Sequence, residues 1–175
     1  PQAWSEAIGF SSPGTDLNWR LPTLKELQTL LEYGTAGACV DTSYFSVPTD
    51  DPEMVWSVTS QAYLARGAWA LSLRNCHTEK MSKDTLNHVL PVMGRSLDFA
   101  QFKENGDGTV TDLATGLMWY KPETRERTWR EALNFCEGLY WAGYDDWRLP
   151  NIKELQSLVN VQLAGPTLDT SFFPG

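Results

Sequence analysis

The sequence is short of basic residues, histidine and cysteine, and it has no long apolar run. Fourteen Lys and Arg stand against 22 Asp and Glu in 175 residues, which gives a formal net charge of −8 at pH 7. Nucleic-acid-binding domains are usually basic, so this balance argues against that class and, more mildly, against polyanionic ligands. No stretch approaches the roughly 20 apolar residues of a membrane helix. We therefore predict no nucleic acid partner and no membrane insertion.

Signatures of catalysis and of metal binding are also missing. The sequence holds no Gly-x-Ser-x-Gly, P-loop or His-Glu-x-x-His pattern. Its two histidines, His77 and His88, have no partners at the spacing of a zinc site. Asn105, Asp107 and Asp112 resemble a calcium loop only faintly, and a plain turn is the preferred interpretation. We predict no metal, no cofactor and no enzymatic activity.

What the sequence does contain is one phrase written twice. Residues 19–31 read WRLPTLKELQTLL and residues 147–159 read WRLPNIKELQSLV, so nine of thirteen positions are identical at an offset of 128. Asp41–Phe45 and Asp169–Phe173 recur at the same offset. Solenoid repeats have periods of about 20–50 residues, so this spacing indicates two related domains instead.

Comparison of the copies predicts where each domain lies. Residues 1–97 are expected to form a first copy that lacks an N-terminal hairpin. Residues 98–175 are expected to form a second copy that lacks C-terminal strands. We expect a hairpin within residues 99–120 and assign it to the second copy. Two alternatives are that it pairs with the first domain's sheet, or that it exchanges strands with another molecule.

Capping boxes, in which a side chain at each end of a four-residue window caps the other's backbone, predict three helices. They are formed by Thr23 with Glu26, by Asn151 with Glu154, and by Thr128 with Glu131. Gly34 is expected to end the first helix. The apolar stripes predicted for the three helices are Leu24, Leu27, Leu30 and Leu31; Ile152, Leu155, Leu158 and Val159; and Trp129, Ala132, Leu133 and Cys136.

Glycine-containing turns and the alternation of apolar with polar residues predict the strands. Turns at 106–108 and 114–116 bracket strands at 109–111 and 117–120. In the first copy, residues 68–73 alternate like a strand, and residues 88–90 are expected to form another. The fold class predicted is therefore α+β.

These elements resemble the DUF1566 family, which includes the C-terminal domain of the Legionella collagen-like adhesin. The resemblance rests on residues 106–112, 115–119 and 147–155, and on 55–59 with 68–70 in the first copy. It implies a duplicated C-type-lectin-like fold, with two helices flanking a small twisted antiparallel sheet and long loops. The fold is related to the formylglycine-generating enzymes, but their catalytic cysteine pair has no match here. The family is typically exported by bacteria, and some members bind sulfated glycans.

The resemblance also frames the three cysteines. Lectin-like domains often tether the helix that carries Cys136 to a final strand, and the first copy has Ser11 at the equivalent site. Cys136 is therefore either a disulfide partner without its mate or a buried free cysteine. Cys39 and Cys76 are candidates for a separate bridge in the first domain, which would imply an oxidising compartment.

The functional prediction is a non-catalytic binding module located outside the cell or in the periplasm or cell envelope. Its ligand would be a glycan or a protein surface, bound on the irregular section between residues 48 and 87. Alternatives are a structural repeat that displays other domains, and an enzyme related to the formylglycine-generating group. Trp56 and Trp69 are expected in the core, and Arg20 and Arg148 in structural ion pairs. The candidate ligand-binding residues are Tyr63, Arg66, Arg74, Asn75, His77, Lys80 and Lys83.

Overall fold

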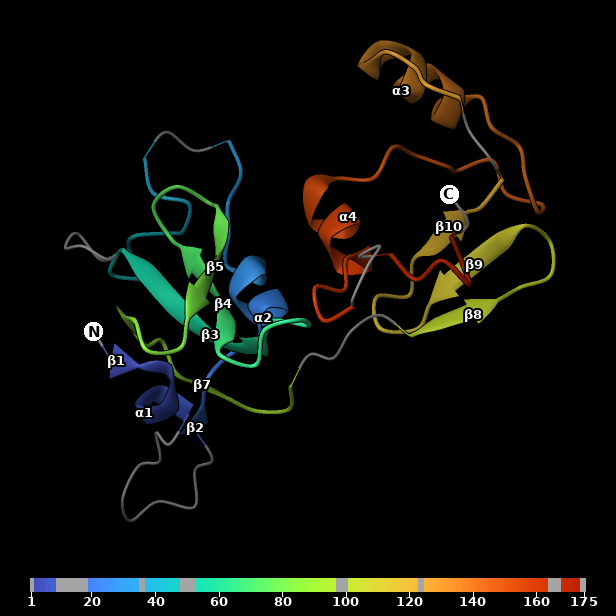
Figure 1. The fold of residues 1–175 in the computed structure, drawn as a ribbon. Helices are drawn as coiled ribbons and strands as arrows, with labels where there is room; N and C mark the ends of the chain where they lie inside the picture. Colours follow the sequence, from blue (N-terminus) through green and yellow to red (C-terminus); the bar gives the residue numbers. More distant parts are fainter. Residues whose placement is uncertain are drawn as a thin grey trace. The chain divides into compact units, whose positions relative to one another are not determined.

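The chain divides into two units of mixed helix and antiparallel strand (Figure 1), and its fold class is α+β. A computed structural model describes residues 2–8, 19–34, 37–47, 53–96, 101–122, 125–163 and 168–173. Unit 1 comprises Pro1–Asp98 with Val161–Gly165, and unit 2 comprises Phe99–Asn160 with Pro166–Gly175. Ser11, the position equivalent to Cys136, lies outside the described residues.

Unit 1 is built around a three-stranded antiparallel sheet in the order β3–β4–β5. Two shorter strand pairs, β1–β6 and β2–β7, join the beginning of the unit to its end. The elements are β1 (Gln2–Ala3), α1 (Trp4–Ile8), β2 (Trp19–Arg20), α2 (Leu24–Thr29), β3 (Met54–Ser60), β4 (Gly67–Ser72), β5 (Thr78–Ser82), β6 (Leu86–Asn87) and β7 (Val92–Met93).

The strands β3 and β4 are apolar on both faces, and each face meets a helix. Val55 pairs with Leu71, and both side chains pack with α2. The next pair, Trp56 and Ala70, points to the opposite face because side chains alternate along a strand, and it packs with Ala7 of α1. The two helices therefore cover opposite faces of one sheet.

Helix α2 begins at the predicted cap but ends earlier than predicted. Thr23 and Glu26 form the full capping box, and the Leu24 amide donates to Thr59 Oγ1 on β3 at 2.9 Å. The helix ends at Thr29, so the prediction of a stop at Gly34 was wrong. After the helix the Glu32 amide donates to the Cys39 carbonyl at 2.6 Å. This tertiary hydrogen bond redirects the chain before the glycine is reached.

The strand predicted at residues 88–90 was also misplaced. The structure has β6 before it and β7 after it, and His88 makes only a single parallel bridge to Val55. Its amide donates to Met54 and its carbonyl accepts from Trp56, each at 2.9 Å. Pro91 follows and cannot donate to a ladder. The segment therefore lies beside β3 at His88 only and does not continue as a strand.

A disulfide joins Cys39, in the loop after α2, to Cys76, in the turn after β4, with their Cα atoms 5.5 Å apart. The Cys39 amide also donates to the Leu73 carbonyl at 2.8 Å. Cys39 is buried in the same cluster as Leu27 and Val55. The bridge therefore fastens the loop that follows α2 onto the end of the sheet.

Unit 2 contains a separate three-stranded sheet and two helices. Its elements are β8 (Phe102–Glu104), β9 (Thr109–Asp112), β10 (Met118–Tyr120), α3 (Trp129–Glu137) and α4 (Ile152–Leu158). Both predicted turns are present, and β8, β9 and β10 pair with one another and with no described strand of unit 1. Asp107 accepts from the Thr109 amide and hydroxyl at 3.0 and 2.6 Å. Asp112 accepts from Ala114 and Thr115.

The helix α3 has the predicted cap but not the predicted burial. Thr128 and Glu131 form the full capping box. Trp129, expected to begin the apolar stripe, is 72% exposed, and no residue of α3 is buried. Cys136 is half-buried with a free thiol, and burial raises the pKa of that thiol. The stripe therefore has no adequate apolar cover among the described residues.

Thiol counting checks the cysteine assignment. Of the three cysteines, we expect one to react with an alkylating agent in denaturant without reductant, and three to react after reduction. In the folded chain, Cys136 should react more slowly than in denaturant, because the raised pKa leaves less thiolate. Three reactive thiols without reductant would contradict the bridge.

Leu27 and Leu155 offer a matched test of how well each repeated helix is covered. They occupy equivalent positions, yet their side chains are 1% and 44% exposed. We expect Leu27→Ala to lower the free energy of unfolding of unit 1 by about 2–5 kcal/mol. Leu155→Ala should cost unit 2 no more than about 1 kcal/mol. Urea unfolding followed through the indole NMR signals of Trp56 and Trp147 separates the two units, and equal losses would count against the difference in cover.

Candidate functional site

The seven candidate ligand-binding residues do not form one surface. They divide between the two ends of β4, with Lys80 between them on β5. Tyr63, Arg66 and Lys83 lie at the end where β4 begins, and Arg74, Asn75 and His77 lie where it ends. A strand rises about 3.3 Å per residue, so the length of β4 separates the groups.

At the first end, the loop between β3 and β4 presents a highly exposed candidate residue. Tyr63 is 75% exposed and its neighbour Leu64 is 52% exposed. The loop is closed by backbone hydrogen bonds from Gln61 to Gly67 at 3.0 Å and from Gly67 to Leu64 at 2.8 Å. The Arg66 carbonyl accepts from the Lys83 amide at 2.7 Å. The exposed tip is thus held on an ordered backbone.

Lys83 has an internal role at this end. Its Nζ donates to Ser60 Oγ at 3.0 Å and to the Ala65 carbonyl at 2.9 Å. The same atom lies 4.0 Å from the centre of the Trp4 ring, a cation–π arrangement. Lys83 therefore braces the loop that carries Tyr63, and its charge is already engaged.

At the other end, Glu53 gathers the polar side chains. Arg74 Nε lies 3.1 Å from Glu53 Oε2, and Asn75 Nδ2 donates to Glu53 Oε1. The Ser72 hydroxyl donates to the same Oε1 at 3.2 Å. His77 Nε2 lies 3.8 Å from a carboxylate oxygen of Glu79. These contacts fix the turn beside the Cys39–Cys76 bridge, and they use the groups that were candidates for ligand contact.

Lys80 faces Trp69 across the β4–β5 ladder. The two residues are paired in register, and Lys80 Nζ lies 5.1 Å from the centre of the indole ring. Trp69 is only half-buried, although Trp56 is fully buried as predicted. The Trp69 Nε1 atom is buried without a hydrogen-bond partner among the described residues. Lys80, on the edge strand β5, therefore lies over part of the indole carried by the central strand β4.

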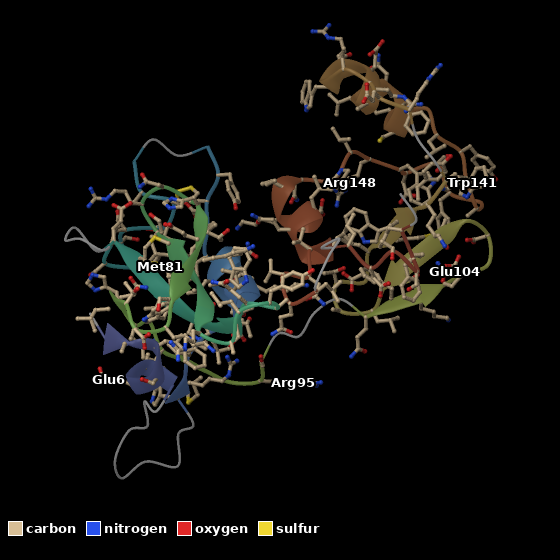
Figure 2. The ribbon with its side chains drawn as sticks, viewed as in Figure 1. Glu6, Met81, Arg95, Glu104, Trp141 and Arg148 are labelled. Carbon is tan, nitrogen blue, oxygen red and sulfur yellow. A yellow bond between two sulfur atoms is a disulfide. The ribbon has the colours of Figure 1, made fainter. Side chains whose placement is uncertain are left out.

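The arginine of the repeated phrase makes the same ion pair in both copies. Arg20 donates to both oxygens of Glu26, at 2.7 and 2.6 Å. Arg148 pairs in the same two-pronged way with Glu154 (Figure 2). Each glutamate also accepts from the backbone amide of its helix cap, at 2.8 Å. The pair locks the Trp-Arg-Leu-Pro segment to the helix, which is a structural role.

The pair also perturbs the titration of its members. The hydrogen bond from Arg148 holds the pKa of Glu154 below its ordinary value, and the pKa of Arg148 is raised by the same contact. The pKa of Arg20 is raised by its hydrogen bond to Glu26. Arg148 and Glu154 therefore both stay charged at neutral pH.

Unit 2 contains a pocket of about 660 Å³ that sequence-based reasoning missed. It lies between α3 and α4 and is lined by Phe135, Trp147, Leu149 and Leu155, among others. Tyr120 contributes an aromatic wall whose ring centre lies 6.1 Å from those of Phe135 and Trp147. The signal available in the sequence was the offset of 128, which makes several of these residues equivalent to core positions of unit 1.

A second aromatic contact joins Trp141 to the turn between β8 and β9. Trp141, labelled in Figure 2, donates from Nε1 to the Asp107 carbonyl at 2.9 Å, and its ring lies edge-on to Tyr120. Gly108 has φ of 83°, and a Cβ there would lie 3.2 Å from the indole. The positive φ favours glycine, and a Cβ would also crowd the Trp141 ring. The hairpin turn is thereby fixed against the segment that leads to the second copy of the phrase.

A family model described as the Lcl C-terminal domain matches residues 2–93 and 108–175. The chain belongs to this family. Each matched segment contains one copy of the repeated phrase, and the match confirms the resemblance predicted from the motifs. Comparison with curated proteins and with solved structures found no match to this Lcl C-terminal domain chain.

Two classes of site are not found in the described part of this Lcl C-terminal domain protein. Within those residues, no three side chains of His, Cys, Asp or Glu gather as a metal ion would require. Within the same ranges, no helix is long and apolar enough to cross a membrane.

The lowered pKa of Glu154 predicts that the stability of unit 2 depends on pH. Because its folded pKa lies below its unfolded value of about 4.5, its contribution to stability is present above that pH and is lost as the pH falls through the folded pKa. Glu154→Gln should therefore destabilise unit 2 at pH 6 by no more than about 1 kcal/mol, as expected for a largely exposed pair. The difference from wild type should shrink as the pH falls below 4.5 and through the folded pKa. Urea unfolding read from the Trp147 indole measures it, and a difference that stays constant from pH 6 to pH 3 would exclude this linkage.

Proposed function

We propose that the chain is a non-catalytic binding module of an exported bacterial protein, and that it binds a glycan or a protein surface through the β3–β4 loop of unit 1. The observation that carries this proposal is the exposed pair Tyr63 and Leu64 on a backbone closed by hydrogen bonds. Exposed aromatic side chains on loops are common contact residues. Arg66, exposed beside them, adds hydrogen-bond donors.

The rigidity of the loop supports a binding role. Binding usually pays for ordering loops and side chains, and here the loop is ordered before any ligand arrives. Lys83 braces it from beneath with two hydrogen bonds. A tyrosine ring offers a flat apolar face and a hydroxyl, which suits stacking against a sugar or packing in a protein interface. A neutral ligand fits better than a sulfated polysaccharide, because the net charge is −8.

The fold we propose for each unit is C-type-lectin-like. In unit 1, two helices flank a small sheet, and two strand pairs join the ends of the unit. The Cys39–Cys76 disulfide supports an oxidising location, either extracellular or in the periplasm or cell envelope. Membership in the Lcl C-terminal domain family is consistent with export. The absence of a known catalytic motif in the sequence favours a module that binds without catalysis.

A display module without a ligand is the second candidate, and one observation favours it. Arg74, Lys80 and Lys83, which were expected to contact a ligand, are engaged inside the unit. Under this alternative the loop carrying Tyr63 is only a surface feature. The two candidate functions therefore differ in whether the chain binds any ligand.

A glycan array probed with the full chain tests both candidates, followed by binding measurements on two tyrosine variants. We expect Tyr63→Ala to weaken binding by about tenfold or more, as loss of an aromatic anchor does. Tyr44→Ala is the matched control, because Tyr44 is also highly exposed in unit 1 but lies outside the loop, and it should change affinity by less than about twofold.

Absence of any retained glycan or captured protein would favour the display candidate. Equal effects of the two tyrosine substitutions would move the binding site away from the β3–β4 loop.

A further inference from the structure

The turn between β8 and β9 contains the one Asn-Gly pair of the sequence. β8 ends at Glu104 and β9 begins at Thr109, so residues 105–108, which read NGDG, connect them. An asparagine followed by glycine is a reactive pair, because no side chain hinders the attack of the glycine nitrogen on the asparagine side chain. Gly106, which is exposed, has a φ of 81°, a conformation that glycine adopts without strain. The turn therefore presents a reactive pair at the end of a hairpin.

The two reacting groups of this pair are held differently. The backbone amide of Gly106, which would attack, has no hydrogen-bond partner among the described residues. The side chain of Asn105, which would be attacked, is held on β9. Its Nδ2 donates to Thr109 Oγ1 and to Thr111 Oγ1, each at 2.9 Å. The attacking nitrogen is thus free, and the two threonine hydroxyls restrain the side-chain amide.

Asp107 and Gly108 form a second pair of this kind, but the carboxyl of Asp107 is held in its less reactive form. An aspartate side chain cyclises readily only when it is protonated. Asp107 Oδ1 accepts from the hydroxyl and the amide of Thr109 at 2.6 and 3.0 Å, and the hydroxyl contact holds the pKa of Asp107 below its ordinary value. The carboxyl therefore stays ionised at neutral pH, whereas the side chain of Asn105 is neutral and open to attack.

We propose that Asn105 is a modification site, at which the chain converts its own asparagine to aspartate or isoaspartate. The Gly106 nitrogen loses its proton to solvent base and bonds to Asn105 Cγ, while the bond from Cγ to Nδ2 breaks and that nitrogen leaves as ammonia. Water then opens the cyclic imide at either carbonyl. Opening at one carbonyl gives aspartate, and opening at the other gives isoaspartate, in which the backbone runs through the side chain. The conversion consumes water, releases ammonia and needs no oxidant or reductant.

Either product disrupts the turn that Asn105 now stabilises. A carboxylate has no proton to donate, and the Thr109 hydroxyl proton already goes to Asp107. Two oxygens would therefore face each other where a hydrogen bond of 2.9 Å had been. Isoaspartate also lengthens the backbone, which displaces the 3.1 Å hydrogen bond from the Asn105 amide to the Thr109 carbonyl. The modification therefore opens the end of the β8–β9 hairpin.

Trp141 reports on this turn. Its Nε1 donates to the Asp107 carbonyl at 2.9 Å, and Gly108 lies against its ring. An open turn would release this indole. Trp4 is the reference in unit 1, where its Nε1 donates to the Ser57 carbonyl at 2.8 Å. This inference does not rest on the ligand surface proposed for unit 1.

Peptide mapping by mass spectrometry tests the chemistry on the full chain, incubated in mildly alkaline buffer. Asn105 should gain the mass difference between an amide and a carboxylic acid, with aspartate and isoaspartate separated by chromatography. It should convert at least about tenfold faster than Asn151, which precedes the β-branched Ile152. The proposal is overturned if Asn105 stays intact until other asparagines have converted, or if Asp107 isomerises before it.

Two variants test the restraint and the consequence separately. Thr111→Val removes one hydroxyl that holds Asn105 Nδ2, and it should speed conversion by about fivefold, the factor that one net hydrogen bond represents. Asn105→Asp supplies one product directly, and hydrogen exchange at Trp141 Nε1 should then accelerate by about fivefold or more while Trp4 is unchanged. An unchanged conversion rate in the first variant, or an unchanged Trp141 rate in the second, would contradict the proposal.

Discussion

The two-sided burial of the β3–β4 hairpin is the interaction on which unit 1 depends. Val55 and Leu71 meet α2, whereas Trp56 and Ala70 meet α1. Burying one large apolar side chain stabilises a fold by about 1.5–3 kcal/mol, and neither five- or six-residue helix is long enough to be stable alone. The helices are therefore held by the strands they cover. The disulfide, the ion pair and the short strand pairs add stability to the packing of these helices on the hairpin.

The duplicated phrase separates local from tertiary causes of structure. Both copies form the same capping box, the same Arg–Glu ion pair and the same turn at the aspartate. These features involve residues within about six positions of each other, so the sequence reproduces them in either unit. The burial of the apolar stripe is not reproduced, because it depends on strands distant in the chain. Local interactions thus survive where the tertiary contacts differ.

The same distinction explains what could be predicted from the sequence. The caps at Thr23, Thr128 and Asn151 and the glycine turns of unit 2 were correct because each is a short-range pattern. The end of α2 and the positions of β6 and β7 were not predicted, since they depend on hydrogen bonds that no short sequence pattern signals, from Glu32 to Cys39 across a loop and from His88 to Met54 across the unit. The candidate surface was split for a similar reason: residues 63 to 83 are close in sequence, but β4 carries them to opposite ends of a sheet. Predicting the pocket would have required knowing which residues of the two copies occupy equivalent positions in space.

The pairing of β1 with β6 and of β2 with β7 has a mechanical consequence. Each pair contains two residues per strand, and together they close unit 1 between its beginning and its end. A pulling force applied at those two ends would load these short pairs before it reached the hydrophobic sheet. If the sheet then unfolded, the disulfide between Cys39 and Cys76, which are 37 positions apart in sequence, would prevent the segment between them from extending. At about 3.3–3.6 Å per extended residue, this segment would otherwise add roughly 120–130 Å to the length of the chain. Under tension, unit 1 would therefore extend only through the residues that lie outside the disulfide loop.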